Sequence, residues 1–343
     1  MKAAVLNEYG GYDKLKYTDF ELPKINYNEV LIEVKACALN HLDLWIRQGL
    51  RGSALKLPHI LGNDIAGIVK KVDKITNNFK IGDEVVISPG ISCGNCQFCL
   101  QGKDSYCRSY EIIGAMNYHG GYAEYVKVPI QNVLPFNFNL SFEEVASLPL
   151  VFLTAWNMLT TKGKIKMGET ILIYGAGSGV GSAAIQIAKM HGLNVISTVG
   201  NNEKIQKAKN LGADEIINHN TDNLREKIKE FTNKQGVDIV FDHIGEKTWE
   251  NSIKCLKVGG RMVTCGATTG PQGMTDIRYI YSKQLSILGS YMASKNELIE
   301  VLKFVQLNKL KPVVDTILPL QKASQAHKLM EERKHFGKIV LTP

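Results

Sequence analysis

Four cysteines, Cys93, Cys96, Cys99 and Cys107, form a Cys-x2-Cys-x2-Cys-x7-Cys cluster in the first third of the chain. Thiolates at such spacing can wrap around one tetrahedral zinc ion, and the small residue Gly94 eases the turn. Since no histidine interrupts the set, the coordination sphere is closed and leaves no position where a water could be activated. The spacing therefore predicts one structural zinc per chain, with disulfides or free thiols as the alternatives.

A glycine-rich turn, Gly175–Gly181, follows the buried run Thr170–Tyr174 and opens a segment of small residues. In a strand–turn–helix of this kind, backbone N–H groups and the helix dipole bind the pyrophosphate of a dinucleotide. The literal Gly-x-Gly-x-x-Gly pattern fails in every frame, because Val180 and Ser182 occupy the third position. The context predicts a dinucleotide site, and a purely structural turn is the alternative.

The end of the following strand, Thr198–Gly200, should decide which dinucleotide binds. An acidic residue there would accept the ribose hydroxyls of NAD and repel a 2′-phosphate. The sequence instead has small and amide side chains, including Asn201, with Lys204 one helical turn later. This pattern favours NADPH, and Glu203 is the residue that favours NADH.

The helices and strands that must position these residues differ between the two parts of the chain. Before residue 150, short β-branched runs bounded by glycine and proline predict a compact β-rich domain. After residue 150, strands and helices alternate, which indicates a parallel sheet covered by helices on both faces. The predicted early strands are Val30–Ala36, Ala66–Val72, Asp83–Ile87 and Tyr122–Val128; the later strands are Thr170–Tyr174, Asn194–Val199, Glu215–Asn218, Asp238–Asp242, Arg261–Cys265 and Lys338–Leu341; the helices are Val180–His191, Glu203–Leu211, Leu224–Phe231, Thr248–Leu256, Leu298–Leu307 and Ser324–Arg333.

Composition fits a two-domain globular protein that stays in the cytoplasm. The 343 residues are 44% hydrophobic and 22% charged, as in ordinary globular domains. No signal peptide is apparent, since the apolar run Ala3–Leu6 is only four residues long, and the apolar stretch Val145–Trp156 is too short to span a bilayer. The formal charge of +8 becomes roughly +6 once four thiolates hold Zn²⁺. Because the lysines are scattered and lack interleaved aromatic residues, we expect neither nucleic-acid nor membrane binding.

With these motifs in place, the chain resembles the medium-chain dehydrogenase/reductase family over essentially its whole length. The resemblance rests on the opening Met1–Ala3, Val34–Asp43, Leu61–Val69, Gly82–Val85, the cysteine cluster, Gly121–Val126, Gly175–Gly181 and the closing Gly337–Leu341. It implies an α/β architecture with a GroES-like catalytic domain (residues 1–150 and 291–343) and a Rossmann cofactor domain (residues 151–290). The active site would lie in the cleft between them.

The chain departs from the zinc alcohol dehydrogenases of this family at each position that ligates their catalytic zinc. Asn40 stands at the position of the cysteine ligand, Asn63 at that of the histidine, and the third ligand should fall near Leu150. Leu42 replaces the hydroxyl residue that usually relays the alcohol proton. Carboxamides and an aliphatic side chain cannot replace thiolate and imidazole as zinc ligands. An unusual metal site made from His41, His59, Asp43 and Asp64 is the alternative.

The resemblance is greatest to the zinc-free quinone reductase branch, although many quinone reductases lack the cysteine cluster. It implies that the N–H₂ of Asn40 lies near the nicotinamide and the substrate oxygen, that Asp43 orients neighbouring groups, and that His41 contacts the pyrophosphate or supplies a proton. The expected cofactor contacts are Thr154, Gly177, Ser178, Gly179, Val180, Gly181, Thr198, Asn201, Lys204, Gly266 and Ala267.

The leading interpretation is an NADPH-dependent reductase of quinones or α,β-unsaturated carbonyl compounds, with NADH as the other candidate cofactor. One alternative is an alcohol dehydrogenase with a divergent zinc site, and another is an NADPH-binding regulatory or RNA-binding protein. By resemblance we also expect a homodimer or homotetramer, joined through edge strands around Ser286–Tyr291.

Overall fold

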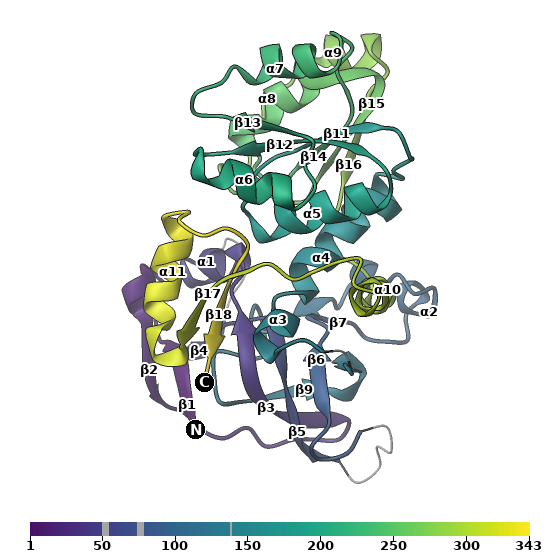
Figure 1. Ribbon diagram of the computed structural model, residues 1–343. Coiled ribbons are helices and arrows are strands. Elements are labelled where there is room, and N and C mark those ends of the chain that lie inside the picture. The colour runs from purple at the N-terminus through teal and green to yellow at the C-terminus, as the bar shows by residue number, and fades with distance from the viewer. Residues whose placement is uncertain (50–54, 74–78, 138) are drawn as a thin grey trace. The chain divides into compact units, whose positions relative to one another are not determined.

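The computed structural model describes residues 1–49, 55–73, 79–137 and 139–343. It divides the chain into two compact units (Figure 1). Unit 1 comprises Met1–Leu150, Ser294–Glu300 and Pro312–Pro343, and unit 2 comprises Val151–Ala293 and Val301–Lys311. The cofactor domain expected from the sequence ended at residue 290, whereas unit 2 also takes in the second half of a later helix.

Unit 1 is built on β-sheets. Its seven-stranded sheet has the order β10-β6-β5-β3-β18-β17, with β9 also paired to β3; a three-stranded sheet has the order β2-β1-β4, and β7 pairs with β8. The strands are β1 (Lys2–Leu6), β2 (Leu15–Asp19), β3 (Glu29–Ala38), β4 (His59–Ile60), β5 (Asp64–Val72), β6 (Glu84–Ile87), β7 (Gly90–Ile91), β8 (Glu111–Ile112), β9 (Tyr125–Pro129), β10 (Val133–Pro135), β17 (Val314–Pro319) and β18 (Lys338–Thr342).

The long strand β3 organises this unit, because it pairs with β5, β9 and β18. Most of its side chains are buried, so this strand lies in the core. Strand β18 runs antiparallel to β3 and parallel to β17. The end of β3 thereby meets the starts of β5 and β18, which brings Asn40, Asp64 and Lys338 together.

The helices and single turns of unit 1 are short. They are η1 (Tyr12–Lys14), α1 (His41–Arg47), α2 (Gln97–Leu100), η2 (Asp104–Tyr106), η3 (Ile130–Asn132), α3 (Phe142–Ala146), η5 (Leu320–Lys322) and α11 (Ala323–Glu331), and α10 (Lys295–Gln306) begins here and continues into unit 2.

Unit 2 contains one parallel sheet of six strands in the order β13-β12-β11-β14-β15-β16. Helices α5 and α6 cover one face, and α7, α8 and α9 cover the other (Figure 1). The order reverses between β11 and β14, which is where parallel sheets of this type bind ligands. The strands are β11 (Thr170–Ile173), β12 (Asn194–Val199), β13 (Glu215–Asn218), β14 (Val237–Asp242), β15 (Leu256–Thr264) and β16 (Ser286–Gly289); the helices are α4 (Pro149–Trp156), which begins at the end of unit 1, the π-helix η4 (Asn157–Lys162), α5 (Gly179–Met190), α6 (Glu203–Asn210), α7 (Leu224–Phe231), α8 (Glu246–Cys255) and α9 (Ile277–Ser282).

The fold class predicted from the sequence, a GroES-like β-rich domain and a Rossmann parallel sheet, is confirmed. Some strand starts were wrong: the strand predicted from Arg261 begins earlier, at Leu256, and the strand predicted from Tyr122 begins only at Tyr125. Tyr122 instead bonds through its backbone to Ala4 and Leu61, so it belongs to a loop held against β1. Several shorter elements were not predicted, among them β1, β2, α1, α3, α4 and β17.

Every helix in the described part of the chain is too short or too polar to cross a membrane.

Candidate functional site

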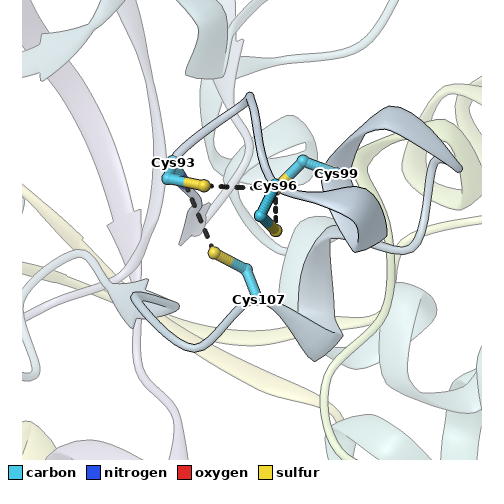
Figure 2. Close-up of side chains that lie close together, drawn as sticks. All are labelled: Cys93, Cys96, Cys99 and Cys107. Atoms are coloured by element: carbon cyan, nitrogen blue, oxygen red, sulfur yellow. Dashed lines mark hydrogen bonds between the residues drawn. The ribbon is translucent and has the colours of Figure 1, made fainter.

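The four cysteines predicted to bind zinc lie together in unit 1, with their sulfur atoms turned toward one another (Figure 2). All four Sγ atoms lie within 4.8 Å of one another. The Cys96–Cys99 and Cys93–Cys99 sulfur distances are 3.5 and 3.9 Å. Four sulfurs bonded tetrahedrally at 2.3 Å from zinc would be about 3.8 Å apart, so this donor set fits one zinc ion.

Backbone groups of the cysteine loop prepare it for thiolates. The N–H of Cys93 donates to Sγ of Cys107 at 3.5 Å. Hydrogen bonds from the backbone of Asn95 and Cys96 lower the pKa of Cys93 to about 6, whereas burial raises the pKa of Cys99 to about 11. A bound dication would stabilise all four thiolates. Among the described residues, this is the one group of three or more metal-ligating side chains that lie close together.

The same loop is attached to the start of helix α10. Asp104, between the third and fourth cysteines, accepts hydrogen bonds from the backbone N–H of Lys295 at 3.1 and 3.3 Å. Nζ of Lys295 donates to the carbonyl oxygen of Gln131 at 2.9 Å, and Gln131 in turn donates to the carbonyl of Ser92 at 3.1 Å. The cysteine loop is thereby joined to two other segments of unit 1.

A second polar cluster is buried at the positions where zinc alcohol dehydrogenases carry their catalytic ligands. Asn40, Asn63, Asp64 and Lys338 are each at most 5% exposed. Nζ of Lys338 donates to Oδ1 of Asn40 at 2.6 Å and to Oδ2 of Asp64 at 2.9 Å. The other oxygen of Asp64 accepts the backbone N–H of Leu150 at 2.8 Å. A lysine ammonium therefore lies among these side chains.

Lys338 fixes the orientation of the Asn40 amide. An ammonium only donates hydrogen bonds, so the amide atom that faces it is the oxygen. The amide nitrogen of Asn40 then donates to Oδ1 of Asn63 at 2.6 Å and to Oδ2 of Asp64 at 2.8 Å. Both N–H bonds of Asn40 are thus engaged inside the protein. The sequence-based expectation that Asn40 donates to a substrate oxygen does not agree with this arrangement.

This donor set does not fit a catalytic zinc ion. Zinc is held by thiolate, imidazole and carboxylate, and the cluster offers two amides and one carboxylate that is already paired with a cation. The alternative set of His41, His59, Asp43 and Asp64 is not among the close metal-ligating groups of the described residues. His41 begins α1, where its ring lies edge-on to Trp45 with the ring centroids 5.5 Å apart, and its role stays a prediction.

Asp43 is a buried hydrogen-bond acceptor that contacts two members of this cluster, Asn40 and Asn63. Its carboxylate accepts from the backbone N–H of Asn40 at 2.7 Å, from the backbone N–H of Gly62 at 3.2 Å, from Nδ2 of Asn63 at 3.2 Å and from the hydroxyl of Tyr122 at 3.0 Å. Gly62 has φ +97°, and a Cβ there would lie 2.5 Å from the Tyr122 ring. Glycine at this position lets the loop pass close to Tyr122, so the geometry agrees with an orienting role for Asp43.

In unit 2, the predicted cofactor turn connects β11 to α5. Gly175 has φ +65°, and a Cβ on Gly181 would lie 2.2 Å from the carbonyl oxygen of Gly175. Ser178 caps α5 by accepting the N–H of Gly181 at 2.9 Å. Oγ1 of Thr198, at the end of β12, accepts the N–H of Gly175 at 3.0 Å. A tight turn of small residues at a helix start fits the pyrophosphate of a dinucleotide.

The remaining cofactor candidates lie on different elements of unit 2. Asn201 lies just before α6, where its side-chain oxygen accepts the backbone N–H of Lys204 at 3.2 Å. Gly266 and Ala267 follow β15 at the same edge of the sheet, and Thr154 is buried in α4. Gly177, Gly179 and Val180 belong to the turn and to the first residues of α5. Their contacts with a cofactor stay predictions.

The sequence reasoning missed His243, which follows β14 at the point where the strand order reverses. Its Nε2 lies 2.9 Å from the carbonyl oxygen of Tyr174 and 3.3 Å from Oγ of Ser178. Because a carbonyl only accepts, Nε2 carries the proton, and burial lowers the pKa of this histidine. The signal that could have found it is its position directly after the strand that neighbours β11. Lys338 was quoted within a sequence motif but was given no role.

Comparisons with known proteins cover nearly all of the chain. Residues 26–137 match the family described as alcohol dehydrogenase GroES-like domain, and residues 179–306 match the zinc-binding dehydrogenase family. The chain is 32% identical to an NAD-dependent alcohol dehydrogenase of Sulfolobus acidocaldarius, over 99% of both proteins. It is 31% identical to the quinone oxidoreductase of Rattus norvegicus, over 99% of this chain and 97% of that protein.

A solved structure of an NAD-dependent alcohol dehydrogenase superposes with a TM-score of 0.96 at 46% identity, covering 100% of both chains. The relatives thus include two kinds of oxidoreductase. The choice between them depends on the residues of this chain's own site.

Proposed function

Because the chain belongs to the medium-chain dehydrogenase/reductase superfamily of oxidoreductases, we propose that it transfers hydride from NADPH to a quinone or an α,β-unsaturated carbonyl compound without a catalytic metal. Membership of this superfamily confirms the resemblance found in the sequence. It makes the chain an oxidoreductase that acts on small molecules. Tight NADPH binding without turnover of any acceptor would support the regulatory or RNA-binding alternative.

The observation that carries the proposal is the buried cluster of Asn40, Asn63, Asp64 and Lys338. Oxidation of a simple alcohol requires removal of its proton as hydride leaves, and zinc assists by stabilising the alkoxide. Amides and an ammonium cannot hold the metal that would do this. An acceptor whose conjugated oxygen takes up charge needs only hydrogen-bond donors, so the cluster favours reduction of a polarised acceptor.

Within this cluster, Lys338 is the residue to which we assign the polarising role. Of its three N–H bonds, Asn40 and Asp64 account for two. The third would donate to the acceptor oxygen, while the positive charge stabilises the negative charge that develops there. Asn40 then serves as the acceptor that aims the ammonium. Bound NADPH would supply the hydride.

The proposed preference for NADPH depends on the end of strand β12. The segment from Thr198 to Asn202 contains no carboxylate, and Gly200 lies beside His219, whose Nε2 would be 3.4 Å from a Cβ at that glycine. Helix α6 begins with Glu203, the residue that favours NADH, and Lys204 follows it. Cationic and amide side chains at this position suit a 2′-phosphate, whereas an acidic side chain would repel it.

A second candidate function is NAD-dependent alcohol dehydrogenation. The observation that favours it is the 46% identity to a solved enzyme of that description. The retained four-cysteine cluster also resembles alcohol dehydrogenases more than quinone reductases. The cysteine cluster does not distinguish the two functions chemically, because its closed sphere of four sulfurs leaves no open position for an alcohol.

The test is a stopped-flow screen of NADPH and NADH oxidation on protein whose zinc content has been measured. The panel contains quinones, α,β-unsaturated ketones and enoyl thioesters, with ethanol and butanol oxidation as the comparison. We expect one zinc per chain, turnover of at least one conjugated acceptor, and a higher kcat/KM with NADPH. Two zinc ions per chain with chelator-sensitive alcohol oxidation would overturn the proposal.

A further inference from the structure

Four buried side chains form a hydrogen-bonded series that begins at Arg47, passes through helix α11 and ends at Asp43. It consists of Arg47 on α1, His327 on α11, Tyr122 in the loop before β9, and Asp43 itself, all at most 1% exposed. The successive distances are 3.1 Å from Arg47 to Nδ1 of His327, 3.3 Å from Nε2 of His327 to Oη of Tyr122, and 3.0 Å from Oη to Oδ2 of Asp43. All four residues belong to unit 1.

Because Arg47 can only donate, it fixes the direction of every hydrogen bond in this series. A guanidinium only donates, so Nδ1 of His327 accepts from Arg47 and the single proton of the neutral ring is on Nε2. That proton points to Oη of Tyr122. The hydroxyl proton of Tyr122 is then directed to Asp43. Arg47 is itself held by the carbonyl of Gly10 at 3.0 Å and by the carboxylate of Glu331.

At the other end, Asp43 behaves as an acceptor on both oxygens. Besides Tyr122, it accepts from the backbone of Asn40 and Gly62 and from the amide of Asn63. A protonated carboxyl would carry a proton of its own where one of these donors now lies. The arrangement therefore requires Asp43 to be ionised, and it holds Asn40 and Asn63 in place only in that state.

The groups around Asp43 shift its pKa in opposite directions. Burial raises the pKa of Asp43 to about 6, and the charge of Asp64 acts in the same direction. The hydrogen bonds from Asn40 and Tyr122 and the charge of Lys338 on β18 lower the pKa. Burial raises the pKa of the Cys37 thiol on β3, and the charge of Asp43 acts in the same direction. Burial and the charge of Arg47 lower the pKa of His327 to about 3, so its ring is neutral at ordinary pH.

We propose that His327 is a positioning residue for this enzyme: held by Arg47 in the Nε2–H form, it directs the Tyr122 hydroxyl onto Asp43 and so keeps Asp43 ionised as the acceptor that holds Asn40 and Asn63. The inference rests on the proposed function, because it supplies the reductase cluster with its orientation. Through His327, helix α11 then influences the pH range over which Asp43 keeps its hydrogen bonds to Asn40 and Asn63.

The test compares Tyr122→Phe, His327→Leu and His327→Gln in the full-length protein. Phenylalanine keeps the ring and loses the donor, so the pKa of Asp43, followed by carbon-13 NMR of its carboxyl, should rise by about one unit. His327→Leu should do the same. Glutamine can accept from Arg47 and donate to Tyr122, so His327→Gln should restore the pKa to near its original value. Tyr27→Phe, at a tyrosine that is 65% exposed, is the matched control.

The acid limb of the kcat profile for the conjugated acceptor should move upward with the pKa of Asp43, while KM for NADPH stays within about twofold. Nitrogen-15 NMR of the wild type should show Nδ1 of His327 unprotonated. A protonated Nδ1, or an unchanged Asp43 titration in both Tyr122→Phe and His327→Leu, would overturn the inference. These spectra do not need turnover, so a wild-type protein inactive on every acceptor would count against the proposed function, while the spectra alone decide the inference.

Discussion

Lys338 is the residue on which the buried cluster depends, because its ammonium supplies hydrogen bonds to both Asn40 and Asp64. The side chains of Lys338 and Asp64 are 4% and 0% exposed. Water cannot replace the ammonium if it is removed. Asp64 would then lose both its ion pair and one hydrogen bond at a position that water does not reach.

Replacing Lys338 with Met should therefore lower the free energy of unfolding by roughly 3 to 5 kcal/mol, the usual result of removing one partner of a buried ion pair. Lys338→Arg, which keeps the charge, should lose less. Urea unfolding at pH 7, followed by tryptophan fluorescence, measures both. A loss below about 1 kcal/mol in Lys338→Met would show that this ion pair is not buried in solution.

Asp43 should make a pH-dependent contribution to stability. Its pKa is about 6 in the folded protein against 3.8 in the unfolded chain, so the folded state binds a proton between these values and the unfolded state does not. The contribution from Asp43 is thus fully present below pH 3.8 and is lost as the pH rises through 6. The difference in unfolding free energy between wild type and Asp43→Asn should shift against the wild type by roughly 2.5 kcal/mol between pH 4 and pH 7.

Urea unfolding of both proteins at several pH values checks this prediction. The comparison with Asp43→Asn cancels the titration of other carboxyl groups. A difference that grows in favour of the wild type as the pH rises would contradict a raised pKa at Asp43.

At the scale of elements, local sequence patterns located most of the sheet strands and the long helices. Strand β12, Asn194–Val199, and helix α7, Leu224–Phe231, begin and end where the sequence predicted them. Helix α1 was missed. It is seven residues long, and its N-terminus is held by Asp43 and by contacts with Gly62 and Tyr122 that no local pattern reveals. Strand β17 has alternating exposure, but its pairing with β18 is what makes it a strand.

The attachment of the cysteine loop to helix α10 leads to a prediction at this scale. Asp104 binds the first N–H of α10, and Ser294 and Glu297 bond to each other as a capping box at the same end. Asp104→Ala should lower the free energy of unfolding by about 1 kcal/mol, as the loss of a cap usually does. The amide of Lys295 should exchange its hydrogen faster.

Hydrogen exchange followed by mass spectrometry of the peptide around Lys295 measures this effect. Asp104→Asn keeps an acceptor oxygen and is the matched control. The zinc content of both variants should stay at one per chain, since Asp104 is not a ligand. Unchanged exchange at Lys295 in Asp104→Ala would mean that the capping box alone secures the helix.

At the scale of the whole molecule, NADPH should stabilise the protein more than NADH does. A ligand that binds only the folded state adds about 2.7 kcal/mol of stability at a concentration of 100 Kd. We expect a higher Tm with NADPH than with NADH at equal concentration, and we expect Lys204→Glu to reverse the order. Differential scanning fluorimetry on zinc-loaded protein measures both. Equal shifts with the two cofactors would contradict the assigned role of the segment from Thr198 to Lys204.

The sequence could predict the parts of the site that are local and not the parts that are distant. The cysteine cluster and the Gly175–Gly181 turn each lie within one short segment, so their spacing carries the chemistry. The other contacts join distant segments. Lys338 is 298 positions from Asn40, and His327 is 205 positions from Tyr122. The pairing of β18 with β3 brings Lys338 to Asn40, and helix α11 brings His327 to Tyr122. Local spacing reveals neither contact, which is why Asn40 was given a donor role that its engaged N–H bonds do not leave open.

The distance between Asn40 and Lys338 along the chain also has a consequence during biosynthesis. At 5 to 20 residues per second, the ribosome needs about 15 to 60 seconds to make the intervening segment. Strand β18 lies between β3 and β17, so the nascent polypeptide holds an incomplete sheet and an uncompensated Asp64 for that whole interval. The strands from β11 to β16, by contrast, are translated consecutively and can pair earlier. Unit 1 of this enzyme, though begun first, should therefore mature last.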